Sequence, residues 1–242
     1  MARVPRRPAA TFDRTATSAD PVEPLAQLAT EVSQCRGCER LVEWREQAAS
    51  DKRAAYADQE YWGRGVPGFG DPEASILFLG LAPAAHGANR TGRIFTGDRS
   101  GDWLYRALHR AGLANQAESV HREDGLVLER AWVTSAVKCA PPDNKPLPEE
   151  RDRCNAFLVR EMAALVHLRV VVCLGAFAYQ AAATHFGIRP RPKFAHGLEV
   201  STSQNVTLVC SFHPSQQNTF TGRLTETMLD DVVARAVEIA QV

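Results

Sequence analysis

The sequence predicts an α/β fold in which a mostly parallel sheet is sandwiched by helices. Two observations support this prediction: four short, nearly continuous apolar runs, and amphipathic segments that alternate with them. Continuous apolar runs are typical of strands buried on both faces, whereas apolar residues spaced at 3.6-residue intervals indicate helices with one buried side. The alternation favours parallel strands joined by helices. The length of 242 residues suits one domain of this class.

The predicted elements follow one another along the chain. The strands are expected at residues 75–80, 131–137, 170–174 and 206–211. The clearest helical stripes cover residues 103–111 and 228–237, and further helices are expected at 24–34, 149–166 and 176–186.

The first 21 residues are rich in Pro, Ala, Arg and Thr without periodicity. We expect them to form a mobile tail before a single domain at 22–242. No stretch resembles a secretory signal or is long enough to span a bilayer, so a cytoplasmic protein without a membrane role is expected. Lys plus Arg and Asp plus Glu both total 28, so net charge does not argue for nucleic-acid binding. A monomer is the default expectation.

Four of the six cysteines form a pattern that suits a metal centre. Cys35 and Cys38 form a C-x2-C pair, in which a tight turn can aim both sulfurs at one centre, and Cys139 and Cys154 follow far downstream. The alternative is a set of unrelated buried thiols, but the polar context of the C-x2-C pair is unlike a core. Spacing leaves zinc and an iron–sulfur cluster both open. The other two, Cys173 and Cys210, lie within predicted strands and are expected to be small apolar core residues.

Each unusual polar stretch begins where a predicted strand ends. These stretches are 81–101, 138–148 and 212–222, and ligands of open α/β sheets bind outside the carboxyl ends of the strands. The first is glycine-rich and permits close backbone approach to a ligand, and its Phe95 could stack on a planar ring or anchor the loop. A lone histidine is usually structural, but His213 lies at a strand end and leads into polar residues suited to contacting phosphates or an opened base pair.

Three motifs and the cysteines together resemble a known family. The segments GLAPAAHGANRTGRIFTGDRSG, KCAPPDNKP and HPSQQNTFTG, with the four-cysteine pattern, are similar to those of the type B, or family 5, uracil-DNA glycosylases. The resemblance covers nearly the whole chain after the tail. It implies a three-layer αβα sandwich around a central, mostly parallel four-stranded sheet, and a [4Fe–4S] cluster held by Cys35, Cys38, Cys139 and Cys154.

The resemblance also implies an activity in base-excision repair. Enzymes of this family flip uracil, and other deaminated or damaged bases such as hypoxanthine and ethenocytosine, out of double-stranded DNA and hydrolyse the N-glycosidic bond. By matching motif positions, it places Asp98, Asn144 and His213 in the active site and Phe95 beneath the flipped base. His213 is expected to stabilise the leaving base, Asp98 to orient or activate water, and Asn144 to hydrogen-bond to base or water.

Substrate binding is expected to involve further residues of the same loops. The first motif has Leu81-Ala82-Pro83-Ala84 where many relatives carry an acid or amide, and Ser135 stands where related families place an amide that reads uracil. Strict selectivity for uracil is therefore not expected. The full set assigned to substrate binding is Phe95, Gly80, Ala82, Ala84, Ser135, Ser215, Gln216, Gln217 and Asn218.

Two rival functions remain. A non-catalytic iron–sulfur protein that binds nucleic acid would bind DNA tightly without producing abasic sites, and a cysteine-metal hydrolase acting on a small nucleotide would cleave free deoxyuridine. Several basic residues near the cysteines could contact phosphates or form a solvated charged face. They are Arg36, Arg40, Lys138 and Arg153.

Overall fold

The computed structural model describes residues 22–241, so the predicted tail at 1–21 lies outside the described residues. Six strands form one sheet in the order β1-β3-β2-β4-β6-β5. The strands are β1 Phe69–Gly70, β2 Ile76–Gly80, β3 Ala131–Ser135, β4 Val170–Leu174, β5 Glu199–Ser201 and β6 Thr207–Ser211. The four predicted strands are thus confirmed as β2, β3, β4 and β6, and they pair in parallel.

The sheet has six strands, not the four predicted, because a short strand is added at each edge. Both added strands are antiparallel to their neighbours, so the sheet is mixed. β1 pairs antiparallel with β3, and β5 pairs antiparallel with β6. Neither edge strand has an apolar run: β1 has two residues, and β5 is largely exposed. The pattern used to find strands buried on both faces therefore could not detect them.

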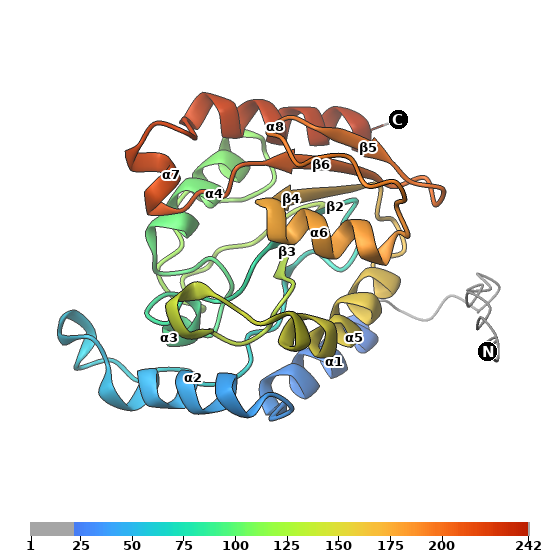
Figure 1. Cartoon of the computed structure of the whole chain (residues 1–242). Coiled ribbons are helices and arrows are strands. Elements are labelled where there is room, and N and C mark those ends of the chain that lie inside the picture. Colours follow the sequence, from blue (N-terminus) through green and yellow to red (C-terminus); the bar gives the residue numbers. More distant parts are fainter. Residues whose placement is uncertain (1–21, 242) are drawn as a thin grey trace, which may run out of the picture.

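Helices cover both faces of the sheet (Figure 1). They are α1 Val22–Gln34, α2 Glu39–Asp51, α3 Ala88–Thr91, α4 Arg99–Arg110, α5 Pro148–Ala164, α6 Ala176–His185, α7 Gln216–Phe220 and α8 Glu226–Ala240, with 3-10 turns at Ala54–Tyr56 and Pro142–Asn144. Helices α4 and α8 pack on one face, and α1, α5 and α6 pack on the other. The five helices predicted from sequence are all present, whereas α2, α3 and α7 were not predicted.

The side chains of β2 show how the sheet separates two cores. Ile76 and Phe78 join the core under α4 and α8, whereas Leu77 and Leu79 join the core under α5 and α6. Each is at most 1% exposed. Burying an aliphatic or aromatic side chain of this size stabilises a fold by roughly 1.5–3 kcal/mol, so this strand anchors both layers.

Cys173 and Cys210 are fully buried neighbours on β4 and β6, which confirms their predicted place in the core. Because the four central strands are parallel, their carboxyl ends meet at one edge, and the loops after β2, β3 and β6 all begin there. Between residues 22 and 241, every helix is too short or too polar to cross a membrane.

Candidate active site and cysteine centre

Phe95 lies at the carboxyl edge of the sheet, between the end of β2 and His213. A Cβ added at Gly80 would lie 2.7 Å from the Phe95 ring, so only glycine leaves room for the ring there. The ring also stacks on that of His213, with centroids 5.8 Å apart and planes at 30°. Glycine at position 80 thus allows the Phe95 ring to pack against the end of β2.

Buried cations fix the backbone on both sides of Phe95, which has a positive φ of 51°. Arg93 forms an ion pair with Asp124 at 2.7 Å. It also donates to the Ser119 hydroxyl at 3.0 Å. Arg90 donates to the carbonyl of Gly97 at 2.8 Å. These contacts hold the unfavourable Phe95 backbone in one conformation.

Asp98 caps the N-terminus of α4. Its Oδ1 accepts a hydrogen bond from the Gly101 N–H at 3.0 Å, as expected of an aspartate at this helix position. A Cβ added at Gly87 would lie 2.0 Å from Oδ2 of Asp98, so the second oxygen occupies space that only glycine leaves open. Burial raises the pKa of Asp98, opposed by hydrogen bonds from the N–H groups of Gly101 and Ser100.

His213 lies two residues after the end of β6 and is held by its backbone. The Asn218 side chain donates to the His213 carbonyl at 2.9 Å, and Gly175 leaves room for the histidine Cβ. Burial lowers the pKa of His213 to about 4, so its imidazole is neutral at pH 7. Within residues 22–241, no side chain or backbone group forms a hydrogen bond with its ring nitrogens.

The start of α4 and the loop after His213 are adjacent. Arg99, next to Asp98, donates from Nε to the Thr219 hydroxyl at 3.3 Å. Its guanidinium also lies 4.3 Å from the centroid of the exposed Phe220 ring. Asp98, Phe95 and His213, which come from two of the three predicted loops, therefore share one edge of the sheet.

Other predicted site residues lie near this edge in different roles. Ser135, paired with Gly80 across the sheet, is 1% exposed and donates its hydroxyl to the Val137 carbonyl at 2.9 Å. Ala82 packs against the cysteine cluster. The Ala84 carbonyl accepts a hydrogen bond from the backbone of Asn89 at 3.0 Å, which turns the chain into α3.

Asn144 is exposed and has a positive φ of 55° in the turn Pro142–Asn144. Among the described residues, no hydrogen bond or ion pair links its side chain to Asp98 or His213. Ser215 caps α7 by accepting from the Asn218 N–H at 3.4 Å. Gln216 and Gln217 are exposed.

The four predicted cysteines come from two parts of the chain that pack together. Cys139 and Cys154 are buried beside Cys38 and Ala82, which lies at the start of the first loop. Three N–H donors reach their sulfurs. Gly37 N–H donates to Cys35 at 3.5 Å, Lys138 N–H to Cys154 at 3.2 Å, and Arg45 Nη1 to Cys139 at 2.9 Å.

Arg45 is a buried cation that was not predicted from sequence. It is 2% exposed, donates to the Cys35 carbonyl at 2.9 Å, and leaves Nε without a partner. Among residues 22–241 it forms no ion pair with a carboxylate. A buried cation without a countercharge costs several kcal/mol, so the structure calls for negative charge at the sulfurs. Four thiolates around a metal cluster would supply that charge.

Any metal held by these cysteines would be constrained by geometry and protonation. Within residues 22–241, no three His, Cys, Asp or Glu side chains converge closely enough to hold one metal ion. A cubane cluster is wider than a single ion, so its ligands lie farther apart. Burial raises the pKa of Cys154 to about 12, so a metal is needed to hold it as a thiolate at neutral pH.

The basic residues near the cysteines bind protein groups. Arg36 forms an ion pair with Glu46, Arg40 with Glu150, and Lys138 with Glu161. Arg153 donates to the Gly37 carbonyl. These contacts join the C-x2-C segment to its neighbours and leave Lys138, 2% exposed, unable to reach a phosphate.

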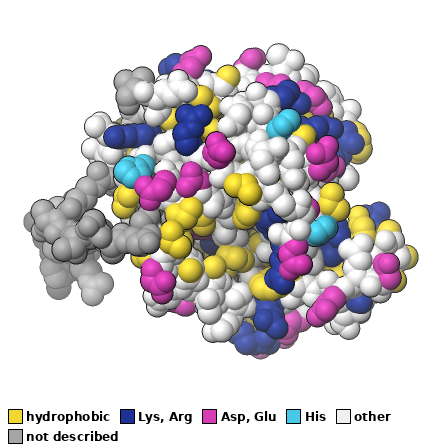
Figure 2. All heavy atoms as spheres, turned by 180° about the vertical axis from the view of Figure 1, so that it is seen from behind, with side chains coloured by type: hydrophobic (Ala, Val, Ile, Leu, Met, Phe, Trp, Pro, Cys, Tyr) yellow, Lys and Arg dark blue, Asp and Glu magenta, His cyan; other side chains and the backbone are white. Residues whose placement is uncertain are grey.

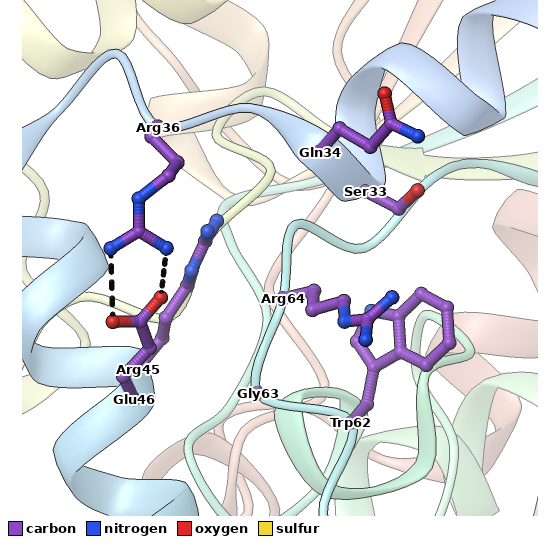
Figure 3. A pocket seen from close by; sticks show the side chains of 8 residues that line it. All are labelled: Ser33, Gln34, Arg36, Arg45, Glu46, Trp62, Gly63 and Arg64. Atoms are coloured by element: carbon purple, nitrogen blue, oxygen red, sulfur yellow. Dashed lines mark hydrogen bonds and ion pairs between the residues drawn. The ribbon is translucent and has the colours of Figure 1, made fainter.

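Two surface cavities lie away from Phe95, Asp98 and His213. The first, of ≈ 430 Å³, is bordered by Arg45, by the pair Arg36–Glu46, and by Arg64 over Trp62 (Figure 3). The second, of ≈ 360 Å³, is lined by residues such as Arg169 and Arg235. Neither matches the predicted base pocket. At that position the rings of Phe95 and His213 stack on each other.

Comparison with known proteins identifies the family to which this chain belongs. A family model described as "Uracil DNA glycosylase superfamily" matches residues 67–236, which include the whole sheet and its carboxyl-edge loops. Mycobacterium tuberculosis has a "Type-5 uracil-DNA glycosylase" that is 53% identical over 219 residues, covering 89% of this chain and 82% of the relative.

A Thermus thermophilus protein of the same name is 49% identical over 207 residues, covering 85% of this chain and 94% of the relative. An Archaeoglobus fulgidus "Type-4 uracil-DNA glycosylase" is 38% identical over 116 residues, or 48% of this chain and 50% of the relative. The chain belongs to the type-5 uracil-DNA glycosylases, a family of enzymes, as the motifs predicted.

Proposed function

We propose that the chain excises uracil from double-stranded DNA in base-excision repair, acting as a monofunctional, monomeric glycosylase that leaves an abasic site. The main support is the edge where Phe95, Asp98 and His213 meet. There a planar ring, a carboxylate and a neutral imidazole are available to one extruded nucleotide. Extrusion is required because the glycosidic bond is inaccessible within the stack.

His213 is assigned to the departing base. Cleavage leaves negative charge on the base, and a ring N–H of a neutral imidazole can donate a hydrogen bond to its carbonyl oxygen without transferring a proton. The ring has the free nitrogens and the lowered pKa that this role needs. A donor of this kind contributes about 3–4 kcal/mol in comparable sites.

Asp98 is assigned to the sugar side. Oδ1 accepts a hydrogen bond from the Gly101 N–H, and Oδ2, which faces Gly87, is assigned to accept one from the attacking water. The carboxylate also offsets positive charge that develops on the sugar. Asn144, which lies on a separate turn, would have to approach with the DNA to contribute a hydrogen bond.

The flipped base is proposed to separate the stacked rings and lie on Phe95. The rings of Phe95 and His213, with planes inclined at 30°, would offer a planar surface on each side of an intervening ring. The space around the flipped base would be lined by five polar side chains and by the backbone around the start of the first loop. They are the side chains of Ser135, Ser215, Gln216, Gln217 and Asn218 and the backbone of Gly80, Ala82 and Ala84. The Ser135 hydroxyl donates its hydrogen bond to the Val137 carbonyl, so it is not assigned to recognising the hydrogen-bonding edge of uracil. Without that selectivity, excision of hypoxanthine and ethenocytosine is also expected.

We propose that Cys35, Cys38, Cys139 and Cys154 hold a [4Fe–4S] cluster. The buried Arg45 and the three N–H donors fit such a group, because both features stabilise negative charge on sulfur. The cluster would supply structural linkage, since hydrolysis transfers no electrons. Release of the base is assigned to His213 and Asp98, not to the cluster.

The test uses duplex oligonucleotides containing uracil, hypoxanthine or ethenocytosine, followed by alkali to cleave abasic sites. Uracil opposite guanine should be released fastest, because a mispaired base costs less to extrude. Undamaged duplex and free deoxyuridine serve as controls. Tight DNA binding with no abasic product would support the non-catalytic rival, and cleavage of deoxyuridine alone would support the nucleotide hydrolase.

Two variants assign the roles. His213→Gln and Asp98→Asn should each slow single-turnover release of uracil by about 100-fold or more, the range for losing one transition-state contact. Cys173→Ala, a small change in the core under α5 and α6, is the control and should retain the rate. Wild-type rates in both site variants would refute the assignments.

A further inference from the structure

A short basic segment beside His213 carries cations without carboxylate partners. Residues 189–193 read Arg-Pro-Arg-Pro-Lys, and all five are exposed. Among residues 22–241, the side chains of Arg189, Arg191 and Lys193 form no ion pair or hydrogen bond. The chain has equal numbers of positive and negative residues, so this basic segment is a local excess of positive charge.

Several exposed arginines elsewhere are compensated by carboxylates. Arg36, Arg110, Arg160 and Arg235 each form an ion pair with a carboxylate at the surface. Figure 2 accordingly shows basic and acidic side chains interspersed over the face seen from behind. Other exposed arginines also lack a carboxylate partner among the described residues, but none of them lies in a group of three cations within five residues, as in the basic segment. They include Arg53, Arg64, Arg130 and Arg169.

The basic segment is fixed against the strand end that carries His213. The Tyr179 hydroxyl donates to the Pro192 carbonyl at 3.1 Å. Just after the segment, the Phe194 ring lies 6.1 Å from the Phe212 ring. His196 Nδ1 accepts a hydrogen bond from the Phe212 N–H at 3.2 Å. Because residue 212 precedes His213, the cations border the candidate active site.

The local chain geometry suits a row of phosphates. Pro192 fixes its own φ and restricts Arg191 to extended conformations. An extended chain advances just over 3 Å per residue, so residues 191 and 193 lie about 6–7 Å apart, comparable with neighbouring phosphates of a DNA strand. Arg223, whose guanidinium is 4.6 Å from the Phe212 ring centroid, adds a third cation near the same strand end.

We propose that Arg191 and Lys193, with Arg223 beside them, bind consecutive phosphates of the DNA strand next to the extruded nucleotide. The inference rests on the proposed function and adds to it a backbone-binding surface outside the three loops. Contacts of this kind position a protein on the duplex without reading its sequence. They also make binding salt-dependent, because each phosphate contact releases condensed counterions.

The test is the salt dependence of binding by the full chain to a fluorescent duplex that contains a tetrahydrofuran abasic analogue. The variant Arg191→Ala/Lys193→Ala should bind about tenfold more weakly or worse in 0.1 M KCl. Its plot of log Kd against log salt should be shallower by about 1.8, or about 0.9 for each lost phosphate. The conservative variant Arg191→Lys/Lys193→Arg should restore the slope.

The matched control is Arg160→Ala/Arg235→Ala, which removes the same charge from ion-paired positions. It should keep the parental slope. An unchanged slope in Arg191→Ala/Lys193→Ala, or an equal loss in the control, would overturn the proposed surface. Uracil release by the parental protein is measured in parallel. Its absence would end the proposed function, while the slopes would still decide whether this segment binds DNA.

Discussion

His213 and Asp98 illustrate how burial acts on two side chains of opposite charge type. Loss of water disfavours the charged form of each, so it lowers the pKa of the histidine to about 4 and raises that of the aspartate. The histidine is consequently neutral throughout the physiological range. For the aspartate, hydrogen bonds from the N–H groups at the start of α4 oppose this effect of burial.

The pKa of His213 predicts how stability depends on pH. The folded pKa of about 4 lies below the ordinary value of 6.5, so the unfolded chain takes up this proton first as the pH falls. The contribution of neutral His213 to stability should be complete above pH 6.5 and decline between pH 6.5 and 4. Urea unfolding across this range, compared between the parent and His213→Gln, measures it. Identical pH dependence in both would contradict the prediction.

Gly87 offers a test of where the Asp98 carboxylate must lie. In Gly87→Ala the new methyl would occupy the position of Oδ2, so the carboxylate must move. A displacement of about 1 Å costs on the order of 100-fold in rate, which single-turnover assays would detect. In the Asp98→Asn background the same substitution should cost much less, because the group it displaces is already impaired. An equal loss in both backgrounds would place the effect elsewhere.

At the scale of elements, the interface between α5 and β3 depends on a buried polar network. Glu161 on α5 accepts from the Trp132 indole at 3.0 Å and from the Thr134 hydroxyl at 2.9 Å. It also pairs with Lys138 at 2.6 Å. Because Lys138 adjoins Cys139, the network also supports the cysteine centre.

Glu161→Gln should destabilise the protein by about 3–5 kcal/mol, since it leaves the Lys138 ammonium buried without its countercharge. The free energy of unfolding in urea, followed by tryptophan fluorescence, measures the loss. Glu31→Gln breaks the exposed pair with Arg160 and should cost under about 1 kcal/mol. Similar losses in the two variants would show that burial of the pair has no effect.

The elements predicted from sequence are those with a strong hydrophobic signature. β2 and β4 were found because every residue in them is buried. Helix α2 was missed because its only buried charged residue, Arg45, faces the cysteines and interrupts any apolar stripe. At the site, motif order indicated the loops that carry Asp98 and His213. The contacts of Gly87 and Arg45 depend on packing between distant segments, which no local pattern reveals.

At the scale of the whole molecule, the cysteine centre joins the N-terminal helices to the rest of the fold. Cys35 and Cys38 lie between α1 and α2, whereas Cys139 follows β3 and Cys154 lies on α5. A shared metal cluster would therefore constrain segments that lie far apart in the sequence.

The proposed cluster predicts that Cys35→Ser/Cys38→Ser lacks iron, has a lower apparent melting midpoint and exposes the α1–α2 region to protease, because binding of the group would contribute to folding. Iron analysis, thermal unfolding and limited proteolysis measure these effects. Cys210→Ser, in the sheet core, is the control and should keep the iron. Full iron content in the double variant would exclude these ligands.

The strand order has a consequence for synthesis of the protein. β2 lies between β3 and β4, and both follow it in the chain. Its fully apolar segment thus leaves the ribosome before either parallel neighbour exists. Until those partners are translated, the nascent chain presents an unpaired strand that invites aggregation. Chaperone demand should consequently be greatest midway through translation, and slowing the ribosome soon after β2 should reduce the soluble yield.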